Sequence, residues 1–152
     1  MNRTSLTVLL ILLAFFGIAD AWYLTASALT DTALSCDLGA VLDGCNIVAK
    51  SAYSKIMGVP LAAFGVLFYS LMFVAAGLLF VFKHHLLDRA IYWLATVGAL
   101  ASIGFLLLQF VFIKALCIYC IASAVASFMS WFVARDLLRT WRAHRTAAPE
   151  AH

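Results

Sequence analysis

Long apolar runs alternate with short polar segments along the whole chain. Charge-free runs cover residues 59–82, 90–113 and 115–134, and a further run covers 4–19 and continues beyond Asp20 to residue 30. Each run is long enough for a helix of about 20 residues, which is the length that crosses a bilayer. The pattern therefore predicts an all-α integral membrane protein. We expect one domain over residues 1–152, a bundle of four transmembrane helices at about 5–29, 59–82, 90–113 and 115–134.

The composition excludes a soluble protein. Hydrophobic residues make up 66% of the chain, charged residues only 11%, and the mean hydropathy is +1.05. Because soluble domains carry about a quarter charged residues, we expect much of this surface to face lipid. The sequence shows no internal repeat, no low-complexity tract and no nucleotide-binding glycine loop.

Lysine and arginine are distributed unevenly between the segments that flank the runs. One set of flanks holds seven basic residues: Arg3, Lys83, Arg89, Arg135, Arg139, Arg142 and Arg145. The other set holds three: Lys50, Lys55 and Lys114. Because basic residues concentrate on the cytoplasmic side, we expect both termini, the 83–89 connection and a basic tail at 135–152 to lie in the cytoplasm. The net charge of +3 follows from this topology and indicates contact with anionic lipid rather than nucleic acid.

The first apolar run has two interpretations. It can be a cleaved signal peptide, with Ala19-Asp20-Ala21 as the small-residue site. The apolar stretch resumes at Trp22 and Tyr23, however, which favours a retained helix with an interfacial aromatic belt. Asp20 is costly in lipid, so we expect it to face the bundle interior or the outer interface, as a contact to a bound head group or as an anchor.

The outer loop, residues 30–58, is the longest polar segment and faces outward in this topology. It contains Cys36 and Cys45, with turn-forming Asp and Gly residues between them. Residues 46–57 mix polar and apolar side chains, which predicts a short helix lying on the membrane surface. Gly58-Val59-Pro60 then ends the loop and begins the second span.

The fourth run opens with a second cysteine pair, Cys117 and Cys120. In a helix over 115–134 these residues lie at i and i+3, on one face and close enough to form a disulfide. The helix N-terminus stabilises a thiolate, and Lys114 adds a positive charge, so the position favours a reactive pair. The alternative is two buried cysteines that act as small apolar residues. Three serines continue along the Cys120 face, which is therefore expected to point into the bundle: Ser123, Ser127 and Ser130.

All four cysteines map to the outward side, where disulfides form and persist. A mobile loop pair next to a pair at the membrane edge suits an electron relay by thiol–disulfide exchange. Two structural disulfides, or a four-cysteine metal site, are the other interpretations. The four histidines lie in the cytoplasmic connection and tail, so no Cys/His metal site is expected: His84, His85, His144 and His152.

The combined motifs resemble the vitamin K epoxide reductase family over residues 5–139, nearly the whole chain. The motifs that carry the resemblance are the loop cysteines, Ser51, Gly58-Val59-Pro60, Phe64-Gly65, Tyr69 and Cys117-Ile118-Tyr119-Cys120. The resemblance implies a four-helix bundle around a quinone, capped by the outer loop.

The resemblance also implies a role for each cysteine. Cys120 is the thiol next to the quinone, and Cys117 is its partner, which exchanges with Cys45. Cys36 receives electrons first, or forms the loop disulfide with Cys45. Ser51 matches a serine near the quinone head group. A plain helix-surface hydroxyl remains an alternative for Ser51, because Ser54 is equally polar and close by.

Two positions depart from the vertebrate members of the family. Leu61 and Ala124 stand where those enzymes carry an asparagine and a tyrosine, which favours plain quinone reduction over epoxide reduction. The chain ends soon after Arg145, without the thioredoxin-like domain fused to some bacterial relatives, so the redox partner is expected to be a separate protein.

The sequence therefore predicts a multi-pass enzyme of the inner (plasma) membrane that supports disulfide bond formation. It is expected to re-oxidise a periplasmic DsbA-like thioredoxin-fold protein, to reduce ubiquinone or menaquinone, and to use no metal. The alternatives are a vertebrate-type vitamin K epoxide or quinone reductase and a non-catalytic, disulfide-stabilised membrane scaffold.

Overall fold

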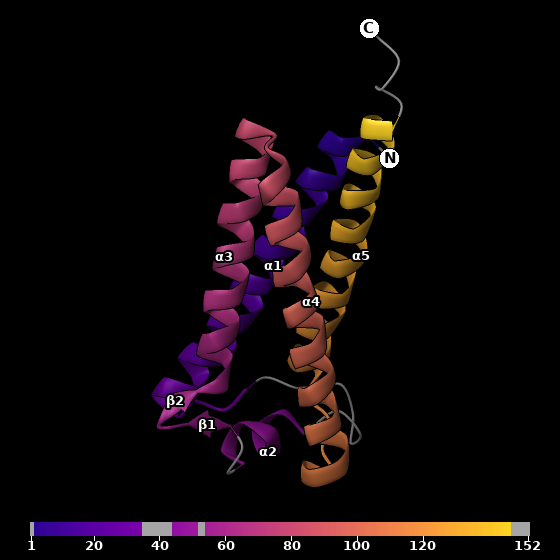
Figure 1. Cartoon of the computed structure of the whole chain (residues 1–152). Coiled ribbons are helices and arrows are strands. Elements are labelled where there is room, and N and C mark those ends of the chain that lie inside the picture. The colour runs from indigo at the N-terminus through magenta and orange to yellow at the C-terminus, as the bar shows by residue number, and fades with distance from the viewer. Residues whose placement is uncertain (1, 35–43, 52–53, 147–152) are drawn as a thin grey trace, which may run out of the picture.

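Four long helices run side by side as a bundle (Figure 1). The protein is described here by a computed structural model, in which residues 2–34, 44–51 and 54–146 are described. The helices are α1 (Arg3–Thr30), α3 (Leu61–Phe82), α4 (His85–Leu107) and α5 (Ile118–Thr146), and α4 continues into a π-helical segment, η1 (Leu108–Ile113). Within these described residues, four segments are long and apolar enough to cross a membrane. The predicted membrane bundle is confirmed, and α1 begins at the same end at which α5 finishes (Figure 1).

The packed core lies between all four helices. Its largest fully buried apolar side chains come from each of them: Leu10, Met72, Leu79, Ile91 and Leu137. The opposite faces carry exposed apolar side chains, among them Phe15, Trp93 and Phe132. An apolar outer surface is what a lipid environment requires, so helix contacts depend on close packing rather than on hydrophobic burial alone.

The connection between α3 and α4 is shorter than the predicted 83–89 segment. Only Lys83 and His84 separate the helices, and Lys83 turns the chain with a left-handed φ of 50°. Asp88 and Arg89, which fall in the predicted connection, lie instead in the first turns of α4. Asp88 is fully buried there and pairs with Arg3 of α1 at 2.8 Å, so its charge is compensated within the bundle.

The last helix differs from the predicted range 115–134 at both ends. It begins at Ile118, because Lys114 has a left-handed φ of 54° and residues 114–116 are not helical. It continues to Thr146, beyond the end of the apolar run. Arg135 lies 5.8 Å from the centre of the Trp131 ring, one turn earlier. Charge thus marks the limit of the apolar span and not the limit of the helix.

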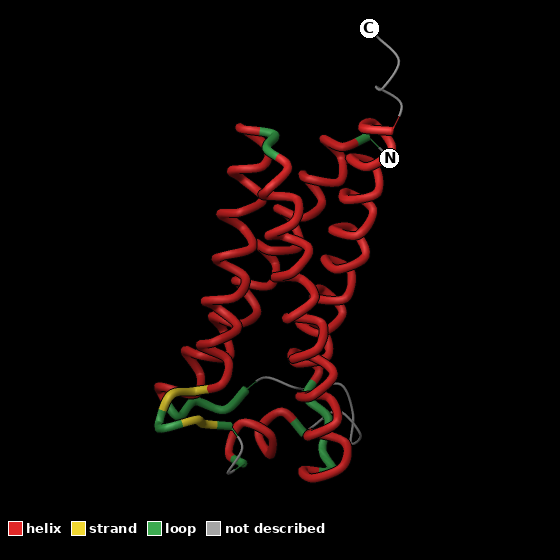
Figure 2. Tube along the Cα trace, viewed as in Figure 1, coloured by secondary structure: helices red, strands yellow, loops and turns green. Residues whose placement is uncertain are grey.

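The outer loop folds differently from the predicted surface helix at 46–57. A short helix, α2 (Cys45–Lys50), is present, but beyond it the chain forms a hairpin of β1 (Lys55–Ile56) and β2 (Val59–Pro60). Met57 and Gly58 both have positive φ, 51° and 85°, as a two-residue type I′ turn requires. These elements lie across one end of the bundle (Figures 1 and 2).

Candidate functional site

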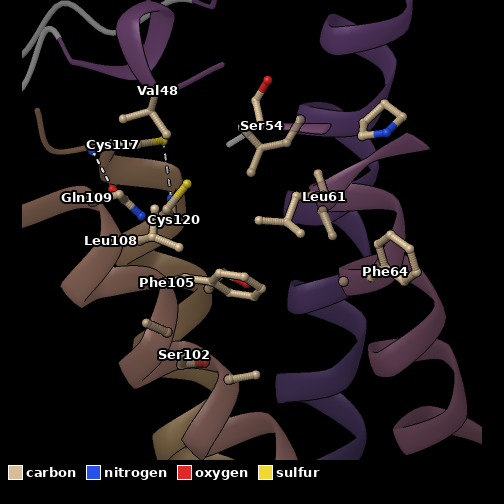
Figure 3. A pocket seen from close by; sticks show the side chains of 18 of the residues that line it. Val48, Ser54, Leu61, Phe64, Ser102, Phe105, Leu108, Gln109, Cys117 and Cys120 are labelled. Carbon is tan, nitrogen blue, oxygen red and sulfur yellow. Dashed lines mark hydrogen bonds between the residues drawn. The ribbon is translucent and has the colours of Figure 1, made fainter. Parts of the chain in front are cut away.

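An apolar cavity of about 360 Å³ lies between the four long helices and is bounded at the outer end by α2. Its size falls within the range of small-molecule sites, about 300–1,000 Å³. Aliphatic and aromatic side chains from every long helix form the wall, including Leu24, Phe64, Phe68 and Phe105. Figure 3 shows Phe105 and Leu108 on one side of the space, with Leu61 and Phe64 on the other. The cavity suits a flat apolar molecule with few polar groups.

Both cysteines of the Cys117/Cys120 pair line this cavity. Cys117 is the N-cap of α5, because its carbonyl accepts the first helical hydrogen bond, from the N–H of Ile121 at 3.0 Å. The Cys117 sulfur takes the place of a capping oxygen and accepts a hydrogen bond from the Cys120 N–H at 3.4 Å (Figure 3). The predicted proximity of the two residues is thus observed, with Cys117 capping the helix rather than lying within it.

The position lowers the pKa of the Cys117 thiol below its ordinary value. The side-chain hydrogen bond from Cys120 is the largest cause, backbone hydrogen bonds from Cys120 and Tyr119 add to it, and burial opposes it. Lys114, whose charge was expected to add to this effect, is exposed and has a left-handed φ of 54°. A hydrogen-bonded thiolate at a helix N-terminus is the attacking species in disulfide exchange.

We expect Cys117 to react as a thiolate at lower pH than an ordinary cysteine. In a Cys36→Ser, Cys45→Ser protein, the rate of reaction with methyl methanethiosulfonate, followed at Cys117 by mass spectrometry, should reach half its maximum at a pH below the ordinary thiol value. Replacing Cys120 by Ala removes the side-chain hydrogen bond and keeps the one from the backbone N–H, so the midpoint should rise. A midpoint that Cys120→Ala leaves unchanged would show that Cys120 does not stabilise the thiolate.

Gln109 is a site residue that the sequence did not single out. It lies in η1, is almost fully buried, and lines the cavity. Its Oε1 accepts a hydrogen bond from the Cys117 N–H at 3.1 Å, and its side chain also interacts with the thiol of Cys120 (Figure 3). The available signal was an amide in a long apolar run. A π-helical turn often marks a functional site, and here it carries the residue that holds both cysteines.

Cys45 lies next to this pair. It is the first residue of α2, is fully buried, and belongs to one buried cluster with Leu34 and Cys117. Cys45 takes part in a disulfide, whereas Cys117 and Cys120 are free thiols. Cys36, its predicted partner, lies outside the described residues. Three of the four predicted cysteines therefore meet at the end of the cavity that α2 bounds.

Most polar groups in the cavity wall are already hydrogen-bonded. Tyr69 donates its hydroxyl to the Ser123 carbonyl at 2.6 Å and lies 3.1 Å from the Ser123 Oγ. Ser51 lines the cavity as well, but its hydroxyl donates to the Val48 carbonyl at 2.8 Å. A ligand acceptor would have to compete for either proton.

Ser127 is a fully buried exception. Its side chain is 1% exposed, it lines the cavity, and its Oγ has no hydrogen-bond partner in the part of the chain that the structure describes. A buried hydroxyl without a partner costs about 1–3 kcal/mol, which a ligand acceptor in the cavity would recover. Ser130, one turn further along the same face, bonds instead to the Ala126 carbonyl at 2.8 Å. The predicted inward orientation of this serine face is observed.

The two positions that depart from vertebrate relatives, Leu61 and Ala124, both line the cavity. The wall is therefore apolar at the two positions where the vertebrate relatives carry polar side chains. Asp20 is not part of the wall; its Oδ2 is buried and has no hydrogen-bond partner among the described residues. Over those residues, no three His, Cys, Asp or Glu side chains come together as a metal site would need.

The comparisons with known proteins agree with this arrangement. No curated protein matches the chain. The family model described as "Vitamin K epoxide reductase family" matches residues 8–135, which span the helices, the cavity and the cysteine pair of α5. The chain belongs to the vitamin K epoxide reductase family, a family of membrane helical bundles with disulfide and quinone oxidoreductase activity.

Proposed function

We propose that this protein re-oxidises a separate DsbA-like thioredoxin-fold partner and passes its electrons, through Cys36/Cys45 and then Cys117/Cys120, to a membrane quinone. The observation that carries the proposal is the meeting of Cys45 with the free Cys117/Cys120 pair at the end of an apolar cavity. Adjacent thiols and a lipid-accessible pocket are what a relay from protein dithiols to a lipid-soluble acceptor needs.

Burial supports the order of the cysteines in this proposal. Cys45 is 0% exposed and Cys117 is 1% exposed, so a folded partner protein can contact neither sulfur. This supports Cys36 as the proposed point of entry for electrons from the partner. Cys120 is half-buried and lines the cavity, which supports its proposed role as the thiol next to the electron acceptor.

Each transfer is a balanced exchange. The partner's dithiol becomes a disulfide as the Cys36–Cys45 bond opens. The Cys45 thiolate then attacks the Cys117 sulfur of the Cys117–Cys120 disulfide, and Cys120 leaves with the electron pair and takes up a proton. Cys36 next attacks Cys45, which restores the loop disulfide and releases Cys117 as a thiolate. The low pKa of Cys117 makes it a good leaving group in this last step.

The quinone is the electron-accepting substrate, and it gains two electrons and two protons as Cys117 and Cys120 join in a disulfide. Ubiquinone and menaquinone both offer a flat apolar ring with two carbonyl acceptors. The cavity offers an apolar wall and, among the described residues, a buried donor without a partner, Ser127. Ser51 is retained as a proposed contact to the head group, sharing with a quinone carbonyl the hydroxyl proton that it donates to the Val48 carbonyl. The apolar Leu61 and Ala124 favour a plain quinone over an epoxide.

We expect Ser127→Ala to weaken quinone binding about tenfold, the effect of losing one buried hydrogen bond. The quinone-free protein should keep or slightly raise its thermal midpoint, because the substitution removes a hydroxyl that has no partner. Quinone binding can be followed by quenching of intrinsic fluorescence in nanodiscs. Ser130→Ala is the matched control, since that hydroxyl is bound within its own helix. Equal weakening by both substitutions would argue against a contact from Ser127.

The proposed location is the inner (plasma) membrane, with both termini in the cytoplasm and the cysteines outside. The basic residues support it seven to three, and it agrees with α1 beginning at the end of the bundle at which α5 finishes (Figure 1). The periplasm is also the compartment in which disulfides persist. Lipid then surrounds the exposed apolar faces of the bundle.

The direct test is the absorbance of a soluble quinone analogue over time. Purified protein with a reduced thioredoxin-fold partner should consume the quinone band, and consumption should require both the partner and Cys117/Cys120. No consumption with any partner, alongside four cysteines that resist reduction and alkylation, would contradict the proposal and leave a structural role.

A further inference from the structure

Gly44 lies where the outer loop approaches the bundle most closely. It is buried, and a Cβ atom at this position would lie 2.6 Å from the Leu116 carbonyl oxygen, 2.7 Å from the Leu116 nitrogen and 2.9 Å from the Ala115 Cβ. Two of these three atoms belong to the backbone, so they cannot rotate away. Only glycine lets α2 come this close to the segment that leads into Cys117.

Backbone conformation does not explain this glycine. Gly44 has φ −73° and ψ −7°, values that any residue adopts. The requirement is therefore space. Residues 44 and 45 on the loop side meet residues 115–117 on the bundle side, and the close approach adjoins the two cysteines that would exchange.

Asn46, which follows Cys45 in α2, anchors this helix to Leu34. Its Oδ1 accepts a hydrogen bond from the Leu34 N–H at 2.9 Å, and its Nδ2 donates to the Leu34 carbonyl at 3.2 Å. The Asn46 amide thus joins α2 to Leu34 through one accepted and one donated hydrogen bond. Leu34 itself packs against Cys45 and Cys117. Cys45 therefore lies between two anchors, one on each neighbouring residue.

We propose that Gly44 and Asn46 are positioning residues that hold Cys45 against Cys117 for the internal disulfide exchange. The inference rests on the proposed relay and adds the device that sets its geometry. Exchange requires the attacking, central and leaving sulfurs to align, and a misplacement of about 1 Å can cost about a hundredfold in rate. Neither residue itself lines the cavity.

The first experiment follows the exchange geometry without quinone or partner. In a Cys36→Ser, Cys120→Ser protein only Cys45 and Cys117 remain, and diamide, as the oxidant, joins them in a disulfide measured on non-reducing gels and by peptide mapping. Adding Gly44→Ala should slow this coupling about a hundredfold, and adding Asn46→Ala about tenfold. Asn46→Asp should not restore the rate, because a carboxylate cannot donate to the Leu34 carbonyl.

Gly104→Ala is the matched glycine control, because a Cβ there meets nothing within 4 Å. It should leave the coupling rate unchanged. Coupling of the Gly44→Ala and Asn46→Ala proteins at the rate of their parent would overturn the proposal. This readout stands whether or not the protein reduces quinone.

The second experiment separates positioning from general damage. Gly44→Ala in the four-cysteine protein should lower partner-driven quinone reduction about a hundredfold, while dithiothreitol-driven reduction in a Cys36→Ser, Cys45→Ser background stays within about twofold of its parent. Equal loss on both routes would show a structural role only and overturn the inference. If the unmutated protein shows no partner-driven turnover, the proposed function fails, and the diamide coupling still decides the role of Gly44 and Asn46.

Discussion

Replacing Cys120 by Ala should lower quinone reduction by at least about a thousandfold, whichever reductant supplies the electrons. Cys120 is the thiol that lines the cavity without capping a helix, and without it no disulfide can form at the Cys117 position. Electrons that reach Cys117 then have no two-electron route to the quinone. The measurement is the loss of quinone absorbance, with the partner protein and, separately, with dithiothreitol.

The same substitution should leave quinone binding and the fold intact, since Ala fills nearly the same volume at a half-buried position. Fluorescence quenching by the quinone analogue and the thermal midpoint in nanodiscs provide these controls. Turnover at the unmutated rate, with binding and stability unchanged, would refute the role of Cys120 and place the reacting pair elsewhere.

The membrane architecture was predictable because lipid leaves the chain few choices. Backbone groups in a bilayer must be hydrogen-bonded within the segment, so each apolar run of sufficient length becomes a helix. The helix ends were less predictable, because hydrogen bonding within a helix can continue where the apolar run stops. Arg135 and the residues after it leave the membrane but keep their helical bonds, and Asp88 enters α4 because Arg3, far away in sequence, neutralises it.

The cysteine pair was predictable from its spacing, but the residues that tune it were not. Gln109 contacts Cys117 across a turn in which Lys114 has a left-handed conformation. The hydrophobic periodicity of the sequence does not predict this turn. Gly44 reads as a turn glycine in the sequence, yet its backbone is ordinary and its function is close approach to Leu116. Such roles depend on which segments meet in the folded bundle, and a single sequence does not contain that information in local form.

For the hairpin, in contrast, a local signal was present in the sequence, and the predicted surface helix was still wrong. Ile56, Met57 and Val59 have a mixed apolar pattern that suits a short surface helix, but Gly58 follows Met57 at the point where both need positive φ. A two-residue turn then costs less than helix continuation toward Pro60, whose ring fixes φ and removes a donor. The turn signal was present in the sequence, and it outweighed the amphipathic pattern.

Replacing Cys36 by Ser should block electrons from the protein partner while leaving the small-dithiol route open. Cys45 and Cys117 are both buried, so a folded partner cannot reach either sulfur once Cys36 is lost. Partner-driven quinone reduction is expected to fall by about a hundredfold or more, whereas dithiothreitol, small enough to reach the Cys117–Cys120 pair directly, should support turnover within about threefold of the unmutated protein. Both rates are measured by quinone absorbance.

The comparison with Cys45→Ser makes this test specific to the order of the relay. In both variants the loop disulfide is lost, but only Cys36→Ser keeps the loop thiol Cys45 next to Cys117. In a Cys120→Ser background, Cys36→Ser should therefore still form the Cys45–Cys117 disulfide with diamide, and Cys45→Ser should not. Partner-driven turnover that survives Cys36→Ser but not Cys45→Ser would mean that the partner attacks Cys45 itself. The loop would then have to open away from the bundle before each transfer. Opening would break the contacts that Gly44 and Asn46 make in the structure.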